Sequence, residues 1–273
     1  MPQFTAADGT RLFYSDTGTG LPVLCLAGLT RNHTDFDHVA PHLAMHRLIR
    51  MDYRGRGRSE WADPATYSVP QEAADAIALL DHLDIEQAAL LGTSRGGLIA
   101  MFLAVTAKER LRGVALNDVG PVLEQRRLSI IKDYVGRNPA QKSYQEAARF
   151  RARNWVHFKK VPMQRWLEEV EQHYRQTKAG LEIRYDPALR EPVLASFDAS
   201  PPDIWPLFEA MAGLPLALIR GKNSDLLAEK TANEMIRRRP DIFYANVPDR
   251  GHVPFLDEPE ALHTLNRWLE AML

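Results

Sequence analysis

Residues 90–98 read Leu90-Leu91-Gly92-Thr93-Ser94-Arg95-Gly96-Gly97-Leu98 and join a short apolar run to a segment with helical periodicity. They contain the pattern G-x-S-x-G, which marks an exposed nucleophilic serine when a strand leads in and a helix leads out. Glycines at the two outer positions keep side chains out of the crowded space where strand and helix meet. Ser94 would then lie at the start of a helix, whose free amide groups favour developing negative charge. The stretch therefore predicts a strand, a tight turn and a helix, with a nucleophilic serine at the turn.

The segments on either side of this turn alternate between strand and helix patterns. A continuous apolar run at residues 22–27 predicts a strand buried on both faces, as in a parallel sheet, and further strands are predicted at 47–51, 113–116, 214–220 and 242–247. Helical periodicity predicts helices at 39–45, from Pro70 to about Leu83, at 97–108, 229–239 and 258–273. Alternating apolar residues around Asp8-Gly9 predict a hairpin near the start of the chain. The pattern as a whole predicts an α/β fold with a doubly wound, mostly parallel sheet.

The alternation breaks between residues 120 and 206, where helical periodicity continues without strands and several prolines interrupt it. We interpret this segment as a helical cap inserted across the strand ends, where open α/β sheets bind their ligands. The predicted division is a first part of the sheet domain at residues 1–119, a helical cap at 120–206, and a second part of the sheet domain at 207–273.

Composition and charge narrow the function classes. The chain has 45% hydrophobic and 25% charged residues and a net charge of −1, as in ordinary globular proteins, so neither nucleic acid nor a membrane is expected as a partner. The single cysteine, Cys25, and the absence of a signal-like or membrane-spanning apolar segment favour a cytoplasmic protein. His38, His42 and His46 are spaced by four, but Pro41 fits only the first turn of a helix, so His38 is expected outside that helix and no metal site is predicted. Because no G-x-G-x-x-G follows the first strands, a reaction without a cofactor is expected.

A serine is a poor nucleophile unless a base, oriented by a third group, takes its proton. The chain offers Ser94, Asp225 and His252 in that order, and each follows a predicted strand. Asp118 also follows a strand and is the alternative acid.

With these residues the chain resembles the α/β-hydrolase fold family over nearly its whole length outside the helical insertion. The resemblance rests on five stretches, which are Gly92–Gly96, Asp52–Ser59, Asn117–Pro121, Ser224-Asp225 and Gly251–Phe255. It implies a catalytic order of serine, acid and histidine. Asp225 is favoured over Asp118 as the acid because Ser224-Asp225 resembles the family's usual acid loop, whereas Asn117-Asp118 recurs as a structural feature.

The resemblance also implies roles for the residues around Ser94. His252 would act as the base, and the backbone N–H groups of Leu29 and Arg95 would form the oxyanion hole. Relatives commonly have His-Gly before the first of these amides, where this chain has Ala27-Gly28. The expected substrate pocket would include Trp155, Trp166, Trp205 and Val253, which favour an apolar group.

The expected function is that of a serine hydrolase that cleaves a carboxylic ester of a small or medium apolar substrate through an acyl-enzyme on Ser94. Lactone hydrolysis and carbon–carbon bond hydrolysis use the same constellation in relatives and stay open as alternatives. A non-catalytic protein that binds a small ligand is the alternative from a different class. Residues 124–184 carry more Lys and Arg than Asp and Glu, which suggests an anionic substrate or an acidic carrier protein as partner.

Overall fold

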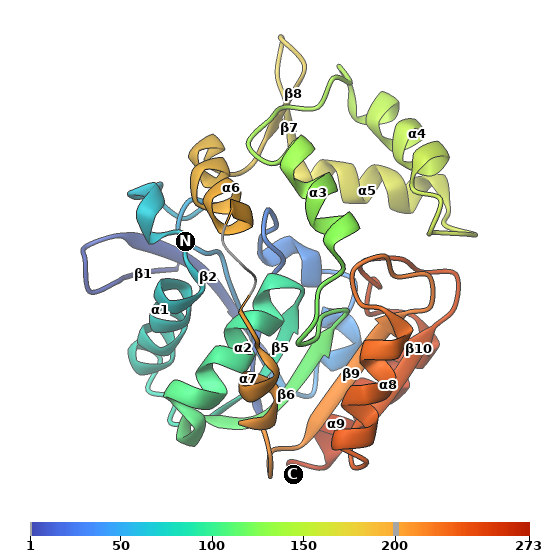
Figure 1. Cartoon of the computed structure of the whole chain (residues 1–273). Coiled ribbons are helices and arrows are strands. Elements are labelled where there is room, and N and C mark those ends of the chain that lie inside the picture. The colour runs from blue at the N-terminus through green and yellow to red at the C-terminus, as the bar shows by residue number, and fades with distance from the viewer. Residues whose placement is uncertain (1, 199–201) are drawn as a thin grey trace.

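Within residues 2–198 and 202–273, which the computed structural model describes, the centre of the protein is an eight-stranded sheet of order β1-β2-β4-β3-β5-β6-β9-β10 (Figure 1). The strands are β1 (Gln3–Thr5), β2 (Arg11–Thr17), β3 (Pro22–Leu26), β4 (Arg47–Met51), β5 (Ala88–Thr93), β6 (Leu111–Asn117), β9 (Leu216–Gly221) and β10 (Phe243–Val247). Strand β2 pairs antiparallel with β1 and β4, and the remaining pairs are parallel. The predicted fold class and the hairpin at Asp8-Gly9 are confirmed.

The central strands are rich in buried apolar residues because both faces of the sheet are covered. All the residues of β5 are buried, and its side chains alternate between two separate cores. One core lies under α1 (Val69–His82), α2 (Arg95–Thr106), α7 (Trp205–Glu209) and α8 (Glu229–Arg238). The other lies under α9 (Pro259–Glu270) and two 3₁₀ helices, His33–Phe36 and Ala40–Leu43.

Two of the predicted helices show how local sequence sets their bounds. Ser68 caps α1 by accepting a hydrogen bond from the amide of Gln71 at 3.3 Å, and Pro70 occupies the first turn, where its missing N–H costs nothing. The helix predicted at residues 39–45 is only the 3₁₀ helix Ala40–Leu43, with Pro41 at its start.

A layer of helices covers the upper edge of the sheet in Figure 1. It contains α3 (Gln125–Tyr134), α4 (Tyr144–Asn154), α5 (Met163–His173) and α6 (Arg190–Asp198). We call this layer the cap. The prediction that this region lacks strands is wrong, because β7 (Tyr174–Gln176) and β8 (Leu181–Ile183) form an antiparallel hairpin there. These strands are too short and too exposed to leave an alternating apolar pattern.

Main-chain hydrogen bonds fasten the cap to the sheet domain. The amide of Gly57 donates to the carbonyl of Arg184 at 2.9 Å, and the amide of Asp186 donates to the carbonyl of Gly55 at 2.8 Å. Beside them, the Tyr67 hydroxyl donates to the Asp186 carboxylate at 2.6 Å. The loop after β4 and the segment after β8 therefore form one continuous seam.

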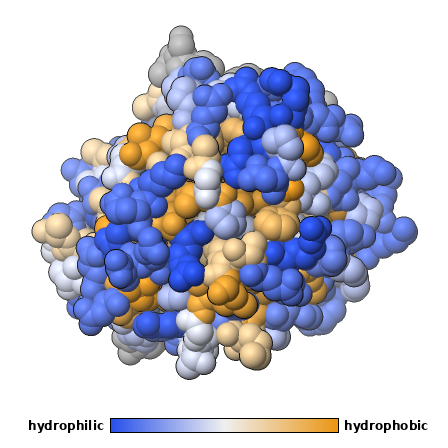
Figure 2. All heavy atoms as spheres, turned by 90° about the horizontal axis from the view of Figure 1, so that it is seen from below, coloured by the Kyte–Doolittle hydropathy of each residue, from blue (hydrophilic) through white to orange (hydrophobic). Residues whose placement is uncertain are grey.

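The face turned away from the cap is mainly hydrophilic, with hydrophobic residues in separate patches, as is usual on protein surfaces (Figure 2). Among the helices of residues 2–198 and 202–273, none has the length and apolar character needed to cross a bilayer.

Candidate active site

Ser94 lies at the turn between β5 and α2 in a strained backbone conformation, with φ 52° and ψ −111°. Its amide donates to the carbonyl of Asn117 on the neighbouring strand at 2.9 Å. A Cβ atom on Gly92 would lie 2.5 Å from the carbonyl carbon of Gly96, and one on Gly96 would overlap the carbonyl oxygen of Leu26. Only glycine fits at both positions, so the predicted strand, turn and helix are confirmed.

The imidazole of His252 lies against the Ser94 hydroxyl, with 3.0 Å between Nε2 and Oγ. His252 follows β10 and is separated from Ser94 by most of the chain, so the fold brings together two residues that the sequence named as partners. In this geometry the hydroxyl donates to Nε2 when the proton of the neutral ring resides on Nδ1. The arrangement allows the proton of Ser94 to move to the ring.

The carboxylate at the other ring nitrogen belongs to Asp118, whose Oδ2 lies 2.8 Å from Nδ1 of His252. The prediction that Asp225 occupies this position is wrong, since Asp225 is placed near the cap, 3.9 Å from Nε2 of His157. Asp118 is fully buried and follows β6, which is the direct neighbour of β5 in the sheet. The end of β6, where Asp118 lies, is therefore beside the end of β5, where Ser94 lies.

Three hydrogen bonds hold Asp118 in place. The Ser224 hydroxyl donates to Oδ2 at 2.6 Å, the amide of Gly221 donates to Oδ1 at 2.9 Å, and the Asp118 amide donates to the carbonyl of Ile219 at 2.7 Å. The Ser224-Asp225 pair thus contributes through its serine, which orients the carboxylate that follows β6. Two bonds to Oδ2, from Ser224 and His252, fix the direction in which that carboxylate points.

Asn117, which the sequence analysis interpreted only as a structural feature, supports the same site. Its side-chain amide donates to the Thr93 hydroxyl at 3.1 Å and to the carbonyl of Pro254 at 3.2 Å. It therefore links the strand that carries Ser94 to the loop that carries His252. The available signal was a polar amide directly after the buried apolar run Val114–Leu116.

The loop after β3 passes beside Ser94. A Cβ atom on Gly28 would lie 3.9 Å from Cβ of Ser94, which places the next amide, that of Leu29, at the edge of the site. The Tyr53 hydroxyl donates to the carbonyl of Ala27 at 3.0 Å, and Arg56 donates to the carbonyl of Leu29 at 3.2 Å. These side chains from the loop after β4 hold a segment that here lacks the histidine common in relatives.

Arg95 is the first residue of α2, so its amide has no partner within that helix. Its guanidinium donates to the Glu72 carboxylate and, at 3.0 Å, to the carbonyl of Tyr67. The side chain is thus drawn toward α1, and the amide at the turn stays next to Ser94.

An aromatic cluster joins the cap to the loop of His252. Trp155 and Phe158 pack against the buried Trp166, with ring centroids 5.5 and 5.7 Å away from its ring, and Phe255 lies 5.6 Å from Phe158. Val253 is half-buried in the same loop. The structure therefore brings two of the predicted pocket tryptophans close to the residues that follow His252.

Trp205 does not join this cluster. It lies in α7, packs edge-on against Phe208 at 5.7 Å, and carries the guanidinium of Arg238 3.8 Å above its ring. Helix α7 packs on α2 as part of the sheet domain. The prediction that Trp205 lines the pocket is therefore wrong, because the helix that carries it belongs to the core rather than to the cap.

A second set of polar residues lies between the loop after β3 and helix α5. We call it the Arg31 cluster, and it consists of Arg31, Asp35, Arg151, Glu169 and His173. Nη1 of Arg31 lies 2.6 Å from Nε2 of His173, 3.3 Å from the Glu169 carboxylate and 3.4 Å from the Asp35 carboxylate. Burial lowers the pKa of His173 well below 6.5, and the neighbouring Arg31 charge lowers it further. His173 is therefore neutral in the folded chain.

This neutral histidine predicts a pH dependence of stability. Below about pH 6.5 the unfolded chain protonates His173 and the folded chain does not, so the free energy of unfolding falls as the pH drops through that range. The expected loss is about 1 kcal/mol between pH 6.5 and 5.5, and His173→Gln should remove it. Denaturant titrations of both proteins at pH 7.0 and 5.5 measure the difference. Equal pH dependence of the two proteins would contradict the assignment.

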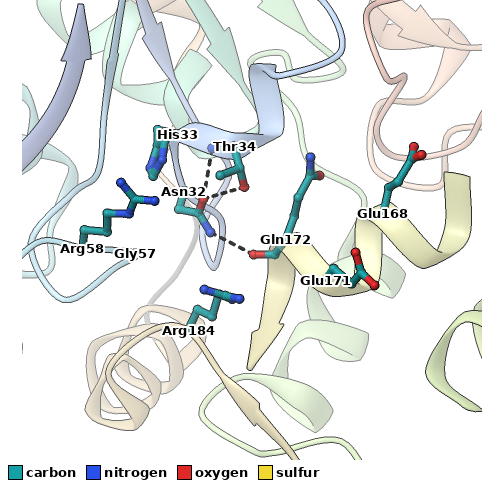
Figure 3. Close-up of a pocket in the computed structure, with 9 residues that line it drawn as sticks. All are labelled: Asn32, His33, Thr34, Gly57, Arg58, Glu168, Glu171, Gln172 and Arg184. Carbon is teal, nitrogen blue, oxygen red and sulfur yellow. Dashed lines mark hydrogen bonds between the residues drawn. The ribbon is translucent and has the colours of Figure 1, made fainter. Parts of the chain in front are cut away.

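A polar hollow of about 340 Å³ opens beside this cluster (Figure 3). It is lined by Asn32, His33, Thr34, Gly57, Arg58, Glu168, Glu171, Gln172 and Arg184. The Asn32 amide donates to the carbonyl of Gln172 at 3.2 Å across it. Helix α5 thus presents one side to Arg31 and another to the hollow. Among residues 2–198 and 202–273, no group of three or more His, Cys, Asp or Glu side chains is arranged to hold a metal ion.

Comparison with known proteins places this geometry in a family. The model of the alpha/beta hydrolase family matches residues 23–265. The 3-hydroxybutyrate-oligomer hydrolase of Cupriavidus necator is 36% identical over 256 residues, which are 90% of this chain and 87% of that protein. The crystal structure of an alpha/beta hydrolase from Novosphingobium aromaticivorans is 38% identical, has a TM-score of 0.91, and covers 98% of this chain and 97% of its own. The 2-hydroxymuconate semialdehyde hydrolase of Pseudomonas sp. (strain CF600) is 38% identical over 40% of each chain. The chain is therefore a hydrolase and belongs to the α/β-hydrolase family.

Proposed function

We propose that this hydrolase cleaves a carboxylic ester through an acyl-enzyme formed on Ser94. The proposal rests on two contacts of the His252 ring. Its Nε2 lies 3.0 Å from the Ser94 hydroxyl, and its Nδ1 lies 2.8 Å from the Asp118 carboxylate. Three such groups in hydrogen-bond contact activate a serine for attack on an acyl carbon. Ser94, His252 and Asp118 need neither a metal nor a cofactor for this reaction.

In the proposed reaction, Ser94 attacks the ester carbonyl carbon while His252 takes its proton. The tetrahedral intermediate collapses, the alcohol leaves with the proton from His252, and the acyl group stays on Ser94. Water then attacks the acyl-enzyme with His252 again as the base, which releases the acid and restores Ser94. Asp118 holds the ring with its proton on Nδ1 and stabilises the cation that forms at each step.

The backbone amides of Leu29 and Arg95 are proposed to stabilise the oxyanion. Both belong to segments next to Ser94, and side chains outside the site anchor each segment. Preorganised amide donors of this kind typically contribute about 10²–10³-fold to kcat.

Two observations favour an ester of a short acyl chain. The aromatic cluster of the cap provides an apolar wall near the loop of His252, which suits an aliphatic group. The relative from Cupriavidus necator, which is 36% identical to this chain, is named for hydrolysis of 3-hydroxybutyrate oligomers, which are short aliphatic esters.

Active-site labelling tests the proposal directly. We expect a fluorophosphonate probe to label the protein at Ser94, as located by peptide mass spectrometry, and Ser94→Ala to abolish labelling. Turnover should then be measured on p-nitrophenyl esters of graded chain length, on lactones and on vinylogous diketones. The highest kcat/KM is expected for short acyl esters. Labelling combined with a preference for diketones would replace ester hydrolysis by carbon–carbon bond hydrolysis, and an unlabelled protein would favour a ligand-binding role.

A further inference from the structure

Arg31 lies in the loop of the proposed oxyanion hole, and its head group contacts Glu169 and His173 of helix α5. A Cβ atom placed on Gly28 would lie 3.3 Å from Cγ of Arg31 and 3.9 Å from Cβ of Ser94, so the two side chains start on either side of the same point. The Arg31 side chain is 18% exposed, so its head group is not completely enclosed by the residues that hold it. The positive charge of Arg31 is therefore close enough to Ser94 to interact with a substrate that Ser94 attacks.

The guanidinium of Arg31 retains unused donors. Within residues 2–198 and 202–273, the hydrogen bonds of its side chain all involve Nη1, which contacts Asp35, Glu169 and His173. The N–H groups of Nε and Nη2 form the edge of the guanidinium that binds a carboxylate with two parallel hydrogen bonds. The cluster thus fixes the head group through one nitrogen and leaves that edge available.

Arg151 adds a second cation to the same cluster. It is 6% exposed, its guanidinium lies 4.8 Å from the centre of the Trp155 ring, and its Nη1 has no hydrogen-bond partner in the described part of the chain. A buried guanidinium nitrogen without an acceptor is costly unless an anion approaches it. Residues 124–184 also contain twice as many Lys and Arg as Asp and Glu, which favours the approach of anions to this side of the molecule.

We infer that Arg31 binds a carboxylate of the substrate, and that the substrate is a carboxylate-terminated oligoester of a short hydroxy acid. The inference rests on the proposed ester hydrolysis at Ser94 and adds the group that selects among esters. In a dimer of a 3-hydroxy acid, the ester carbon and the terminal carboxylate are separated only by the ester oxygen, one methine and one methylene. A single arginine beside the nucleophile can therefore hold the carboxylate of the leaving hydroxy acid while Ser94 attacks the ester.

The test compares one substrate in two charge states. The linear 3-hydroxybutyrate dimer and its terminal carboxamide share the scissile ester and differ only in the carboxylate. The unsubstituted protein should cleave the acid with a kcat/KM about tenfold or more above that of the amide, because a charge-assisted hydrogen-bond pair is lost in the amide. Arg31→Gln should remove this preference, mainly by raising KM for the acid, while kcat changes little.

Arg165→Gln is the matched control. Arg165 lies on α5, the helix that carries Glu169 and His173, and also ties the cap to the sheet domain, through Asp257 at 3.2 Å. Its loss weakens the attachment of the cap without removing the charge beside Ser94, so the preference for the acid should persist. The inference is overturned if the unsubstituted protein cleaves acid and amide equally, if Arg31→Gln slows both equally, or if Arg165→Gln abolishes the preference as well.

A binding measurement separates this inference from the proposed function. Calorimetry on Ser94→Ala with the dimer acid should give a Kd about tenfold lower than on the double variant Ser94→Ala/Arg31→Gln. If the protein proved not to cleave esters at all, that difference would still support Arg31 as the carboxylate site. Equal Kd values for the two variants would reject the site whatever the reaction.

Discussion

Ser94→Ala is expected to lower kcat for ester hydrolysis by up to about 10⁶-fold, and His252→Ala by a similar factor. The reason is that the hydroxyl and the ring nitrogen, 3.0 Å apart, act as one unit: without the base the serine is not activated, and without the serine the base has nothing to activate. Steady-state kinetics on a p-nitrophenyl ester, with active-site titration to establish the fraction of competent enzyme, measure the loss.

The double variant provides the control for this result. Residues acting as a unit are strongly non-additive, so Ser94→Ala/His252→Ala should be about as slow as either single variant. Multiplicative losses would show that the two residues act independently. A loss below about tenfold in Ser94→Ala would remove Ser94 from the chemistry.

Asp118→Asn should reduce kcat by about 10⁴-fold, whereas Asp225→Asn should change it by less than about threefold. An amide at position 118 can donate to Nδ1 of His252 and so favours the ring tautomer that protonates Nε2, where the base is needed. Asp225 lies 3.9 Å from Nε2 of His157 in the cap, whereas the carboxylate at Nδ1 of His252 is that of Asp118. Kinetics of the two variants side by side give the comparison.

Folding controls matter here because Asp118 is fully buried. Asparagine keeps the shape and still has an oxygen that can accept from Gly221 or Ser224, so the thermal unfolding midpoint of Asp118→Asn should stay within several degrees of the unsubstituted protein. A large loss of activity in Asp225→Asn, with Asp118→Asn still active, would reverse the assignment.

Much of the fold could be predicted from the sequence because strands and helices alternate and the buried strands are rich in apolar residues. The strands predicted at 22–27 and 47–51 are β3 and β4 almost residue for residue. The turn at Ser94 was readable because its two glycines are sterically required. The role of His252 could be predicted because it follows Gly251 in the loop after the last strand, β10.

The acid could not be chosen from the sequence, because the choice depends on strand order. Asp118 and Asp225 both follow strands, but only β6 lies next to β5, and the sequence does not state which strands are neighbours. Ser224 added to the difficulty, since its hydrogen bond to Asp118 makes it part of the site although the adjacent aspartate is not. Trp205 was misplaced for a related reason, because helical periodicity does not distinguish a cap helix from α7 on the core.

Main-chain hydrogen bonds between adjacent strands hold two of the three catalytic residues in place. The amide of Ser94 donates to the carbonyl of Asn117, and the amide of Asp118 donates to the carbonyl of Ile219. The aromatic cluster expected to contact the acyl group comes mainly from the cap, whereas Arg31 comes from the loop after β3. Substitutions in the cap can therefore change the substrate preference during evolution while the catalytic residues and the reaction stay the same. Homologues would then differ in substrate long before they differ in reaction.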